Sequence, residues 1–282
     1  MEAIFAGIVL FNPEISRLKE NITHILGQVD RLILVDNGSS NKEEIQSEIQ
    51  SFNTDKILYI NLQKNKGIAT ALNVIADSTE SCGVKWVLTL DQDTVCKDDI
   101  IEKYRPYLSM KNVGQFTCLY QDRNFLEDEC KKEGFGFGNL KKVPWCITSA
   151  ALLNVEAWKK AGKFDESLFI DQVDYDMCLT MREKGYYIYQ VGFVGFVHEI
   201  GQGHIVKVGP WKIKTWNHSP FRRYYGTRNA MLVSQKHKEL SEVCAFLGAV
   251  KHIIIIFIFE DQKLEKLGAG LKGLKDGMKE KR

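Results

Sequence analysis

The sequence has 282 residues, of which 44% are hydrophobic and 26% are charged. These proportions are ordinary for a globular protein and exclude a disordered, collagenous or coiled-coil chain. The formal net charge of only +2 is low for a protein that binds nucleic acid by neutralising phosphates, so no nucleic-acid partner is expected.

The first part of the chain alternates between strand and helix patterns. Buried apolar runs predict four strands, at Ile4–Phe11, Leu32–Val35, Ile57–Ile60 and Trp86–Leu90. Between them, apolar residues at helical spacing predict helices over Ile15–Ile25, Gly67–Ala76 and Asp98–Leu108. Strands that alternate with helices form a parallel sheet with right-handed crossovers, and such sheets bind ligands at the carboxyl ends of their strands.

The second part of the chain is less regular. Residues Lys111–Leu140 predict a loop or hairpin, in which the glycine-rich segment Gly134–Asn139 resembles a mobile loop over a site rather than a dinucleotide fingerprint. The remaining expected elements are a strand at Val143–Leu153, helices at Val155–Ala161 and Val173–Lys184, short strands at Tyr186–Gln190 and Gly192–His198, and one long helix at Glu239–Phe259.

Two carboxylates follow the fourth predicted strand, in the sequence Asp91-Gln92-Asp93. At the end of a buried strand the chain can turn both carboxylates toward one point. Hard divalent cations prefer carboxylate oxygens, and Mg²⁺ typically keeps one or two protein carboxylates together with substrate phosphates. The pattern therefore favours a metal-bound phosphate substrate over a solvated turn.

A second acidic cluster, with Asp171 and Asp174, lies at the start of a predicted helix. A helix N-terminus stabilises carboxylates, so capping is the simplest interpretation, and Asp171 is the candidate cap. The same field keeps an aspartate ionised at neutral pH, as a general base requires. Asp174, in the first helical turn, is the candidate for that role.

A histidine, His198, ends the last predicted strand. The residues that follow it lack the second histidine of a zinc-protease motif, because Gln202 stands at that position. His198 is therefore either a single metal ligand beside carboxylates or a structural histidine.

Arginines and aromatic residues alternate in the segment Phe221–Asn229. Guanidinium groups bind phosphates in a bidentate way, so this segment suits a diphosphate substrate. It equally suits a surface helix whose arginine stems pack on tyrosines. The sequence contains neither a P-loop nor a serine-hydrolase elbow, which argues against ATP hydrolysis and the commonest serine hydrolases.

Taken together, these motifs resemble the family 2 glycosyltransferases with the GT-A fold, and among them the bacterial rhamnosyltransferases. The resemblance covers nearly the whole chain, through Leu10–Pro13, Leu34–Ser39, Asn65–Asn73, Leu90–Thr94, Phe169–Asp174, His198 and Arg223–Asn229. It implies an α/β fold, with a Rossmann-like, mostly parallel central sheet flanked by helices. The variants at Leu90–Thr94 and Phe169–Asp174 are the ones that suggest rhamnose.

The resemblance also implies roles for individual residues. The donor nucleotide would be bound by Phe11, Asn12, Asp36, Asn65, Gly67, Asp91 and Gln92. Asp93 and His198 would bind the metal, Mg²⁺ or Mn²⁺, and Asp174 would be the catalytic base. Val173 replaces the glutamate that the family places beside this base, so acceptor contacts can differ here. Contacts to the acceptor or the diphosphate are expected from Trp145, Asp171, Arg223, Tyr225 and Arg228.

The implied reaction is an inverting, metal-dependent transfer of L-rhamnose from dTDP-L-rhamnose. The acceptor would be a glycan or an undecaprenyl-diphosphate-linked saccharide, in bacterial cell-surface polysaccharide synthesis. The same class with a UDP-hexose donor is the nearest alternative. A nucleotidyltransferase is less consistent, because the loop after the first strand is neither glycine-rich nor basic. An inactive glycan- or nucleotide-binding module is disfavoured by the retained acidic residues.

The sequence divides into a glycosyltransferase domain over residues 1–235 and a C-terminal helical extension over residues 236–282. Residues 1–110 of the first domain would bind the nucleotide and residues 111–235 the acceptor. The seven cysteines include no Cys-x-x-Cys pair, and the N-terminus lacks the positive charge of a signal peptide. Both observations favour a cytoplasmic protein with reduced thiols.

The end of the chain has the pattern of a basic amphipathic helix. Its apolar stripe is formed by Leu264, Leu267, Leu271, Leu274 and Met278. Residues 261–282 carry seven basic and four acidic side chains, a balance of +3. Such a helix can lie on an anionic membrane, so peripheral attachment to the inner leaflet is expected. Packing on its own domain, or on a second subunit in a homodimer, is the alternative.

Overall fold

The computed structural model describes residues 2–122, 138–198, 204–208, 211–215 and 217–280. The chain divides into two compact units. We call them the sheet unit, which is Met1–Ser167 with Asp174–Glu199, and the helical unit, which is Leu168–Val173 with Ile200–Arg282.

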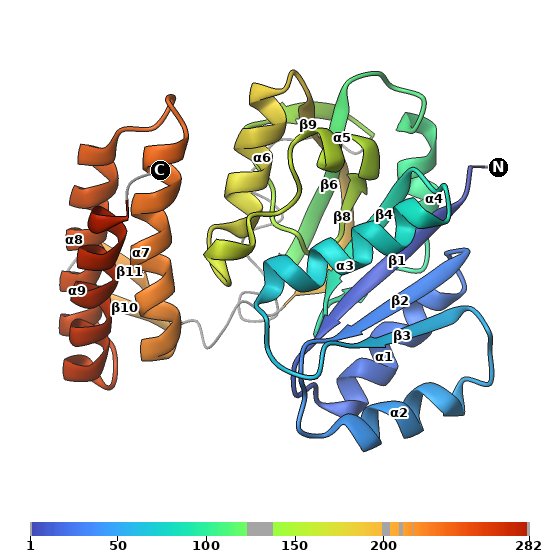
Figure 1. The fold of residues 1–282 in the computed structure, drawn as a ribbon, viewed down its shortest axis with the longest axis horizontal. Helices are drawn as coiled ribbons and strands as arrows, with labels where there is room; N and C mark the ends of the chain where they lie inside the picture. Colours follow the sequence, from blue (N-terminus) through green and yellow to red (C-terminus); the bar gives the residue numbers. More distant parts are fainter. Residues whose placement is uncertain (1, 123–137, 199–203, 209–210, 216, 281–282) are drawn as a thin grey trace. The chain divides into compact units, whose positions relative to one another are not determined.

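Four parallel strands form the first half of the central sheet (Figure 1). They lie in the order β3-β2-β1-β4, with bounds Ile57–Asn61, Arg31–Asp36, Ile4–Leu10 and Trp86–Asp91. All four agree with the predicted strands to within one residue at each end. Parallel pairing brings their carboxyl ends to one edge of the sheet, as the sequence predicted.

The second half of the sheet is mixed rather than parallel. It continues from β4 through β8 (Ala151–Asn154), β6 (Val113–Asp122), β9 (Tyr187–His198) and β5 (Val95–Cys96), and β7 (Leu140–Val143) pairs with β9. β8 is antiparallel to β4 and β6, whereas β6 and β9 are parallel.

Three predictions for this half were wrong. A ten-residue strand, β6, occupies part of the predicted loop at Lys111–Leu140. One long strand, β9, replaces the two short ones, and the predicted strand Val143–Leu153 is instead β7, a loop and β8. The segment 134–137 of the predicted glycine-rich loop lies outside the described residues.

Helices pack on both faces of the sheet. Those of the sheet unit are α1 (Ile15–Leu26), α2 (Lys42–Ser51), α3 (Ile68–Ser81), α4 (Ile100–Tyr104), α5 (Val155–Lys160) and α6 (Val173–Glu183). The main core joins α1 and α4 to alternate residues of β1, including Ile4 and Ile8. Gly7 points to the opposite face, where a Cβ would lie 2.2 Å from the Ile75 side chain, so α3 approaches β1 closely (Figure 1).

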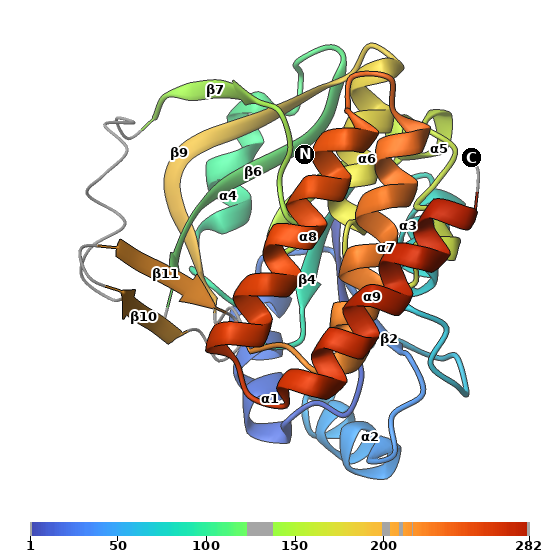
Figure 2. The same ribbon diagram turned by 90° about the vertical axis from the view of Figure 1, so that its left-hand side faces the viewer.

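The helical unit consists of α7 (Pro220–Lys236), α8 (Glu242–Phe259) and α9 (Lys263–Lys279), with a hairpin of β10 (His204–Val208) and β11 (Trp211–Thr215) (Figure 2). Glycines let α9 lie directly on α7. A Cβ on Gly273 would lie 2.3 Å from the Tyr224 carbonyl oxygen, and one on Gly277 would lie 2.6 Å from that of Arg228. The structure therefore groups α7 with α8 and α9, whereas the sequence analysis placed residues up to 235 in the transferase domain.

Candidate active site

The carboxyl ends of the parallel strands bring the predicted donor-binding residues together. Leu10, the last residue of β1, pairs with Asp36 at the end of β2, and Val9 pairs with Asp91 at the end of β4. Asp36 in turn pairs with Asn61 of β3. The residues predicted to bind the donor after β1, β2 and β4 thus lie along one sheet edge, where doubly wound folds bind their ligands.

The loop after β1 is held in place by the two neighbouring loops. The backbone N–H of Phe11 donates to Gln92 Oε1 at 2.8 Å, and that of Asn12 donates to Ser39 Oγ at 2.8 Å. Asn12 returns the contact, because its Oδ1 accepts from the Ser40 N–H at 2.7 Å. In the structure, Gln92 orders the first loop through its side chain, and Phe11 remains exposed beside it.

Asp36 is fully buried, and its carboxylate is bonded to the protein itself. Oδ1 accepts from the Ser39 N–H at 2.8 Å, and Oδ2 accepts from the Tyr59 hydroxyl at 2.7 Å and from Asn61 Nδ2 at 3.2 Å. Burial, followed by the bond to Asp36, raises the pKa of Tyr59 to about 12. Asp36 therefore orders the loop after β2.

Two asparagines join the loops after β2 and β3. Asn37 Nδ2 donates to Asn65 Oδ1 at 3.1 Å, and Asn65 Oδ1 also accepts from the Gly67 N–H at 2.9 Å. Gly38 makes the close approach possible, since its φ is +87° and a Cβ there would lie 2.5 Å from the Lys64 backbone. Gly67, also at φ +87°, precedes α3. These residues shape the edge through their backbone geometry.

The two acidic residues after β4 lie in a tight turn. The Asp91 carbonyl oxygen accepts from Asn21 Nδ2 of α1 at 2.9 Å and from the Thr94 N–H at 3.1 Å. Asp91 and Asp93 are both half-buried. Their carboxylate oxygens are the donors that Mg²⁺ or Mn²⁺ accepts, so this turn suits such an ion.

The described residues provide no complete metal site of their own. Within them, no three His, Cys, Asp or Glu side chains are close enough to hold one ion together. His198 ends β9 beside Asp122, and neither side chain is among those described. Asp91 and Asp93 provide two carboxylates, and Mg²⁺ commonly combines one or two protein carboxylates with substrate phosphates.

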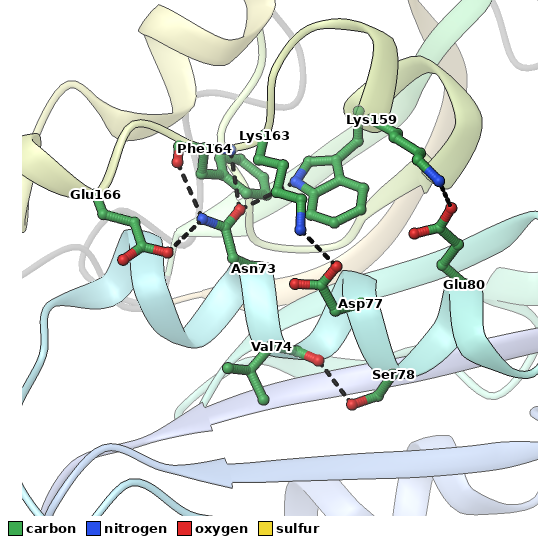
Figure 3. A network of polar contacts seen from close by, with 10 residues as sticks. Asn73, Val74, Asp77, Ser78, Glu80, Lys159, Lys163, Phe164 and Glu166 are labelled. Atoms are coloured by element: carbon green, nitrogen blue, oxygen red, sulfur yellow. Dashed lines mark hydrogen bonds and ion pairs between the residues drawn. The ribbon is translucent and has the colours of Figure 1, made fainter.

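Asp174 is the second residue of α6, and the chain that leads to α6 is anchored by a buried asparagine of α3 (Figure 3). Asn73 Oδ1 accepts from the Phe164 N–H at 2.9 Å and from Trp158 Nε1 at 3.1 Å. Its Nδ2 donates to the Phe164 carbonyl at 3.0 Å and to Glu166 Oε1 at 2.9 Å. The Asn73 side chain thus uses both of its donors and both of its acceptor sites to hold Trp158 and the segment Phe164–Glu166.

The next residues form a loop in an unfavourable backbone conformation. Phe169, Asp171 and Gln172 have φ values of 62°, 63° and 66°, in the left-handed region that non-glycine residues rarely adopt. Asn229 of α7, fully buried, holds this loop in the helical unit. Its Nδ2 donates to the carbonyls of Leu168, Ile170 and Asp171 at 2.7, 2.8 and 3.0 Å.

Asp171 is not the cap of α6. It lies two residues before that helix, and its carboxylate pairs with the Arg222 guanidinium of α7. Tyr225, predicted to contact substrate, stacks on Phe169 of the same loop with ring centroids 5.1 Å apart.

The two other predicted arginines form ion pairs within the helical unit. The Arg223 guanidinium is buried against Glu260, and Arg228 Nη2 lies 2.9 Å from Glu280 Oε2. In this structure Arg223 therefore stabilises its own unit. In the sheet unit, Trp145 is exposed and packs edge-on against Tyr175, next to Asp174 in the sequence, with centroids 5.9 Å apart.

Several residues that order these loops had no role predicted from the sequence. Ser39, Tyr59 and Asn61 surround Asp36, while Asn73 and Asn229 anchor the chain before Asp174. For Asn73 and Asn229 the sequence did contain a signal: each is an asparagine on the buried face of a helix, and a buried amide requires hydrogen-bond partners.

Comparison with known proteins finds a family model that matches the first half of the sheet unit and a relative similar over nearly the whole chain. Residues 6–135 match the family model described as "Glycosyl transferase family 2". The chain is also 26% identical, over 98% of its length and 95% of the relative's, to the dTDP-rhamnosyl transferase RfbF of Shigella flexneri.

Solved structures with the same fold are glycosyltransferases at low sequence identity. The mannosyltransferase PcManGT of Pyrobaculum calidifontis, in complex with GDP-Man and Mn²⁺, matches 99% of this chain and 76% of its own at 14% identity and a TM-score of 0.59. TarS 1–349 of S. aureus in complex with UDP-GlcNAc matches at 14% identity and a TM-score of 0.59, covering 98% of this chain and 81% of its own. A longer TarS chain matches with a TM-score of 0.61 at 14% identity, and this chain, covered over 98%, spans 49% of its length. These matches show the GT-A fold.

Proposed function

We propose that this chain, a glycosyltransferase with the GT-A fold whose residues 6–135 match the family 2 model, transfers L-rhamnose from dTDP-L-rhamnose. The observation that supports dTDP-L-rhamnose as the donor is the similarity to the dTDP-rhamnosyl transferase RfbF over 98% of the chain. That similarity extends over both units, so it includes the segment with Asp174 and the helices that follow.

We assign the nucleotide to the sheet edge formed by the ends of β1, β2 and β4. Phe11 offers an exposed aromatic face there, and the loops around Asn12 and Asn65 are already ordered by the bonds described above. A pre-ordered site loses less conformational entropy when it binds its ligand. Asp36 contributes by fixing the second loop, with or without a direct contact to the base.

A divalent cation would be held by Asp91 and Asp93, together with the donor diphosphate and His198. When bound, it would neutralise the charge that develops on the diphosphate as it leaves. PcManGT, which has the same fold, was solved with Mn²⁺, and this is consistent with a divalent ion here. Activity measured with Mg²⁺ and with Mn²⁺ would decide between the two ions.

Asp174 is the proposed general base. It takes the proton from an acceptor hydroxyl as that oxygen forms a bond to the anomeric carbon of the donor and the bond from this carbon to the diphosphate breaks. A single displacement of this kind inverts the configuration at the anomeric carbon. Its place near the N-terminus of α6 favours the ionised carboxylate that a base needs.

We propose a glycan or an undecaprenyl-diphosphate-linked saccharide as the acceptor, for a chain that acts in the cytoplasm on cell-surface polysaccharide. The slow transfer of donor sugar to water tests the donor and the stereochemistry without knowledge of that acceptor. With dTDP-L-rhamnose and Mn²⁺, NMR should show rhamnose released first with the anomeric configuration opposite to that of the donor. Release from UDP-hexoses but not from dTDP-L-rhamnose would overturn the donor assignment, and retained configuration would overturn the single displacement.

A further inference from the structure

The helical unit exposes a band of large apolar side chains. On α8 it consists of Val243, Leu247, Ile254, Phe257 and Ile258, and on α9 of Leu264, Leu271 and Met278. Exposure is highest at Leu264 (78%) and Val243 (68%). Single exposed apolar residues are common on soluble proteins, but a contiguous band of this size indicates an interaction surface.

The spacing of these residues makes the band continuous along each helix. Val243, Leu247, Ile254 and Ile258 are separated by four, seven and four residues, so they share one face of α8. Leu264, Leu271 and Met278 recur every seven residues on α9. The helices α8 and α9 lie side by side (Figure 2), and they pack together through Ile253 and Leu274.

The inner faces of the same helices are already occupied. Ala249 and Ile253 of α8 pack with Met231 of α7 and Leu274 of α9. At the turn between α8 and α9, Glu260 is buried between Arg223 and Lys266. The band is therefore the outer surface of a helix bundle that has its own apolar core and its own buried ion pairs.

Lysines border the band on the α9 side. Lys275 and Lys279 are exposed on α9 beside Leu271 and Met278. Lys272 is also exposed, and its ammonium lies over the Tyr224 ring of α7, 5.6 Å from the centroid. Lys251 lies at the edge of the α8 stripe, next to Leu247 and Ile254. The acidic side chains nearby are partly engaged, since Asp276 accepts from the Tyr224 hydroxyl and Glu280 pairs with Arg228.

We propose that this band binds the surface of an anionic lipid bilayer, with the axes of α8 and α9 parallel to it. The apolar residues would enter the boundary between headgroups and acyl chains, and the lysines would reach the headgroup charges. The seam of a two-helix coiled coil is narrower than this band, which spans two helices. A lipid surface can cover a band that is two helices wide, and the lysines at its border complement the negative charge of an anionic lipid surface.

The surface differs from the one that the sequence indicated. Leu267 and Leu274 of the tail stripe point into the helix bundle, and Lys266 is buried against Glu260. The larger part of the band is instead supplied by α8. This helix is the one candidate membrane span found in the described part of the chain, with a mean hydropathy of 2.1 over 18 residues. Packing of Ala249, Ile253 and Ile256 against the other helices favours an interfacial position over a spanning one.

Vesicle flotation of the full chain tests the proposal independently of the donor sugar. Vesicles of phosphatidylglycerol mixed with phosphatidylcholine should carry the chain, and those of phosphatidylcholine alone should carry much less. The variant Leu247→Glu/Ile254→Glu should lower the partition coefficient by about tenfold or more, because two inserted side chains become charged. Lys272→Gln/Lys275→Gln/Lys279→Gln should cause a loss of about tenfold or more on anionic vesicles only.

A matched control carries the same chemical change on another surface. Leu58 of β3 is 37% exposed in the sheet unit, and Leu58→Glu should leave flotation unchanged. All variants should keep the melting temperature and the rate of donor hydrolysis, which separates failure of this proposal from failure of the proposed function. Absence of flotation by the wild-type chain would overturn the proposal. So would a dimer in solution that Leu247→Glu/Ile254→Glu dissociates without any flotation, or resistance to alkaline extraction, which would indicate that α8 spans the bilayer.

Discussion

Asn73 and Asn229 are two single residues that fix the path of the chain to Asp174. Asn73 bonds the backbone of Phe164 in both directions, and Asn229 donates to three carbonyls of the left-handed loop that follows. Each left-handed non-glycine residue costs on the order of 1 kcal/mol or more, so the loop persists only because its surroundings hold it. The path of the chain before Asp174, the proposed base, therefore depends on buried amides that have no proposed part in the chemistry.

Replacing Asn229 should show this dependence. Asn229→Ala removes three bonds from Nδ2, after which the Leu168 carbonyl still accepts from the Ile170 N–H, and we expect a loss of about 3 kcal/mol in the free energy of unfolding. Asn229→Asp has nearly the same size but no N–H donor, so it should be at least as damaging. Chemical denaturation measures the loss, and kinetics should show kcat falling more than the affinity for dTDP.

Arg222→Ala is the matched comparison on the same loop. The side chains of Arg222 and Asp171 are 40% and 20% exposed, and a pair at that exposure contributes about 1 kcal/mol or less. If Arg222→Ala destabilised the chain as much as Asn229→Ala, the ion pair rather than the amide would be holding the loop.

Asp174→Asn tests the base directly. The amide has the size of the carboxylate but cannot accept the acceptor proton, so transfer should fall by about 10²-fold or more. Stabilisation of the protein by dTDP and Mn²⁺ should be unchanged, as measured by thermal melting. Near-normal turnover of this variant would show that another group is the base.

At the scale of elements, the sequence was most informative where one pattern dominated. The four parallel strands were predicted because each is a short run made up almost entirely of apolar residues. β9 was predicted as two strands because Gly192 interrupts the pattern, and the pairing of β6 with β9 shifts register around this point. α2 was not predicted, since Ile45 is its one buried residue and it has no apolar stripe. Local patterns do not reveal pairing between distant strands, so β6 was also missed.

The bundle of α7, α8 and α9 depends on a buried ion cluster at its turn. Glu260 accepts from Arg223 and Lys266, and all three side chains are at least 94% buried. Glu260→Gln would leave two buried cations with a neutral partner, and breaking a buried pair in this way costs about 3–5 kcal/mol. Glu80→Gln, which removes an exposed partner of Lys159, should leave the melting temperature unchanged. Equal effects of the two variants in thermal melting would contradict this account.

His218, just before α7, should make stability depend on pH. Burial, and then the charges of Arg222 and Arg223, lower its pKa to about 4, against the opposing effect of Asp171 and Glu260. Between pH 4 and 6.5 the unfolded chain therefore binds more protons at this site than the folded one. Stability should fall as pH decreases through that window and should change no further from this group below it.

The variant His218→Gln isolates this contribution. Because the imidazole is partly exposed, we expect it to account for only about 1–2 kcal/mol of the fall. Urea denaturation at several pH values should show a smaller slope for His218→Gln than for the wild-type chain. An unchanged slope would show that carboxylates alone cause the acid sensitivity.

For the whole molecule, the sequence predicted the enzyme class and the sheet edge that carries the donor motifs. Those motifs are short and each follows a strand, so their order along the chain was sufficient to predict the enzyme class and their common place at the sheet edge. The residues that order the edge were not predictable in the same way. Tyr59 and Asn61 reach Asp36 from a neighbouring strand, and that contact exists only once β2 and β3 pair. The division into units was equally hidden, since it depends on the packing of α9 on α7.

The proposed activity is that of a nucleotide-dependent transferase that uses dTDP-L-rhamnose. The most direct test is the melting temperature of the chain with dTDP, UDP, GDP or CDP, each with and without Mn²⁺. A ligand at about 100 times its dissociation constant adds about 2.7 kcal/mol of stability, which is readily measured. We expect dTDP with Mn²⁺ to stabilise the chain most, and dTDP without the metal to do so less. Stabilisation by UDP in preference to dTDP would contradict the donor, and no shift with any nucleotide would contradict the claim itself.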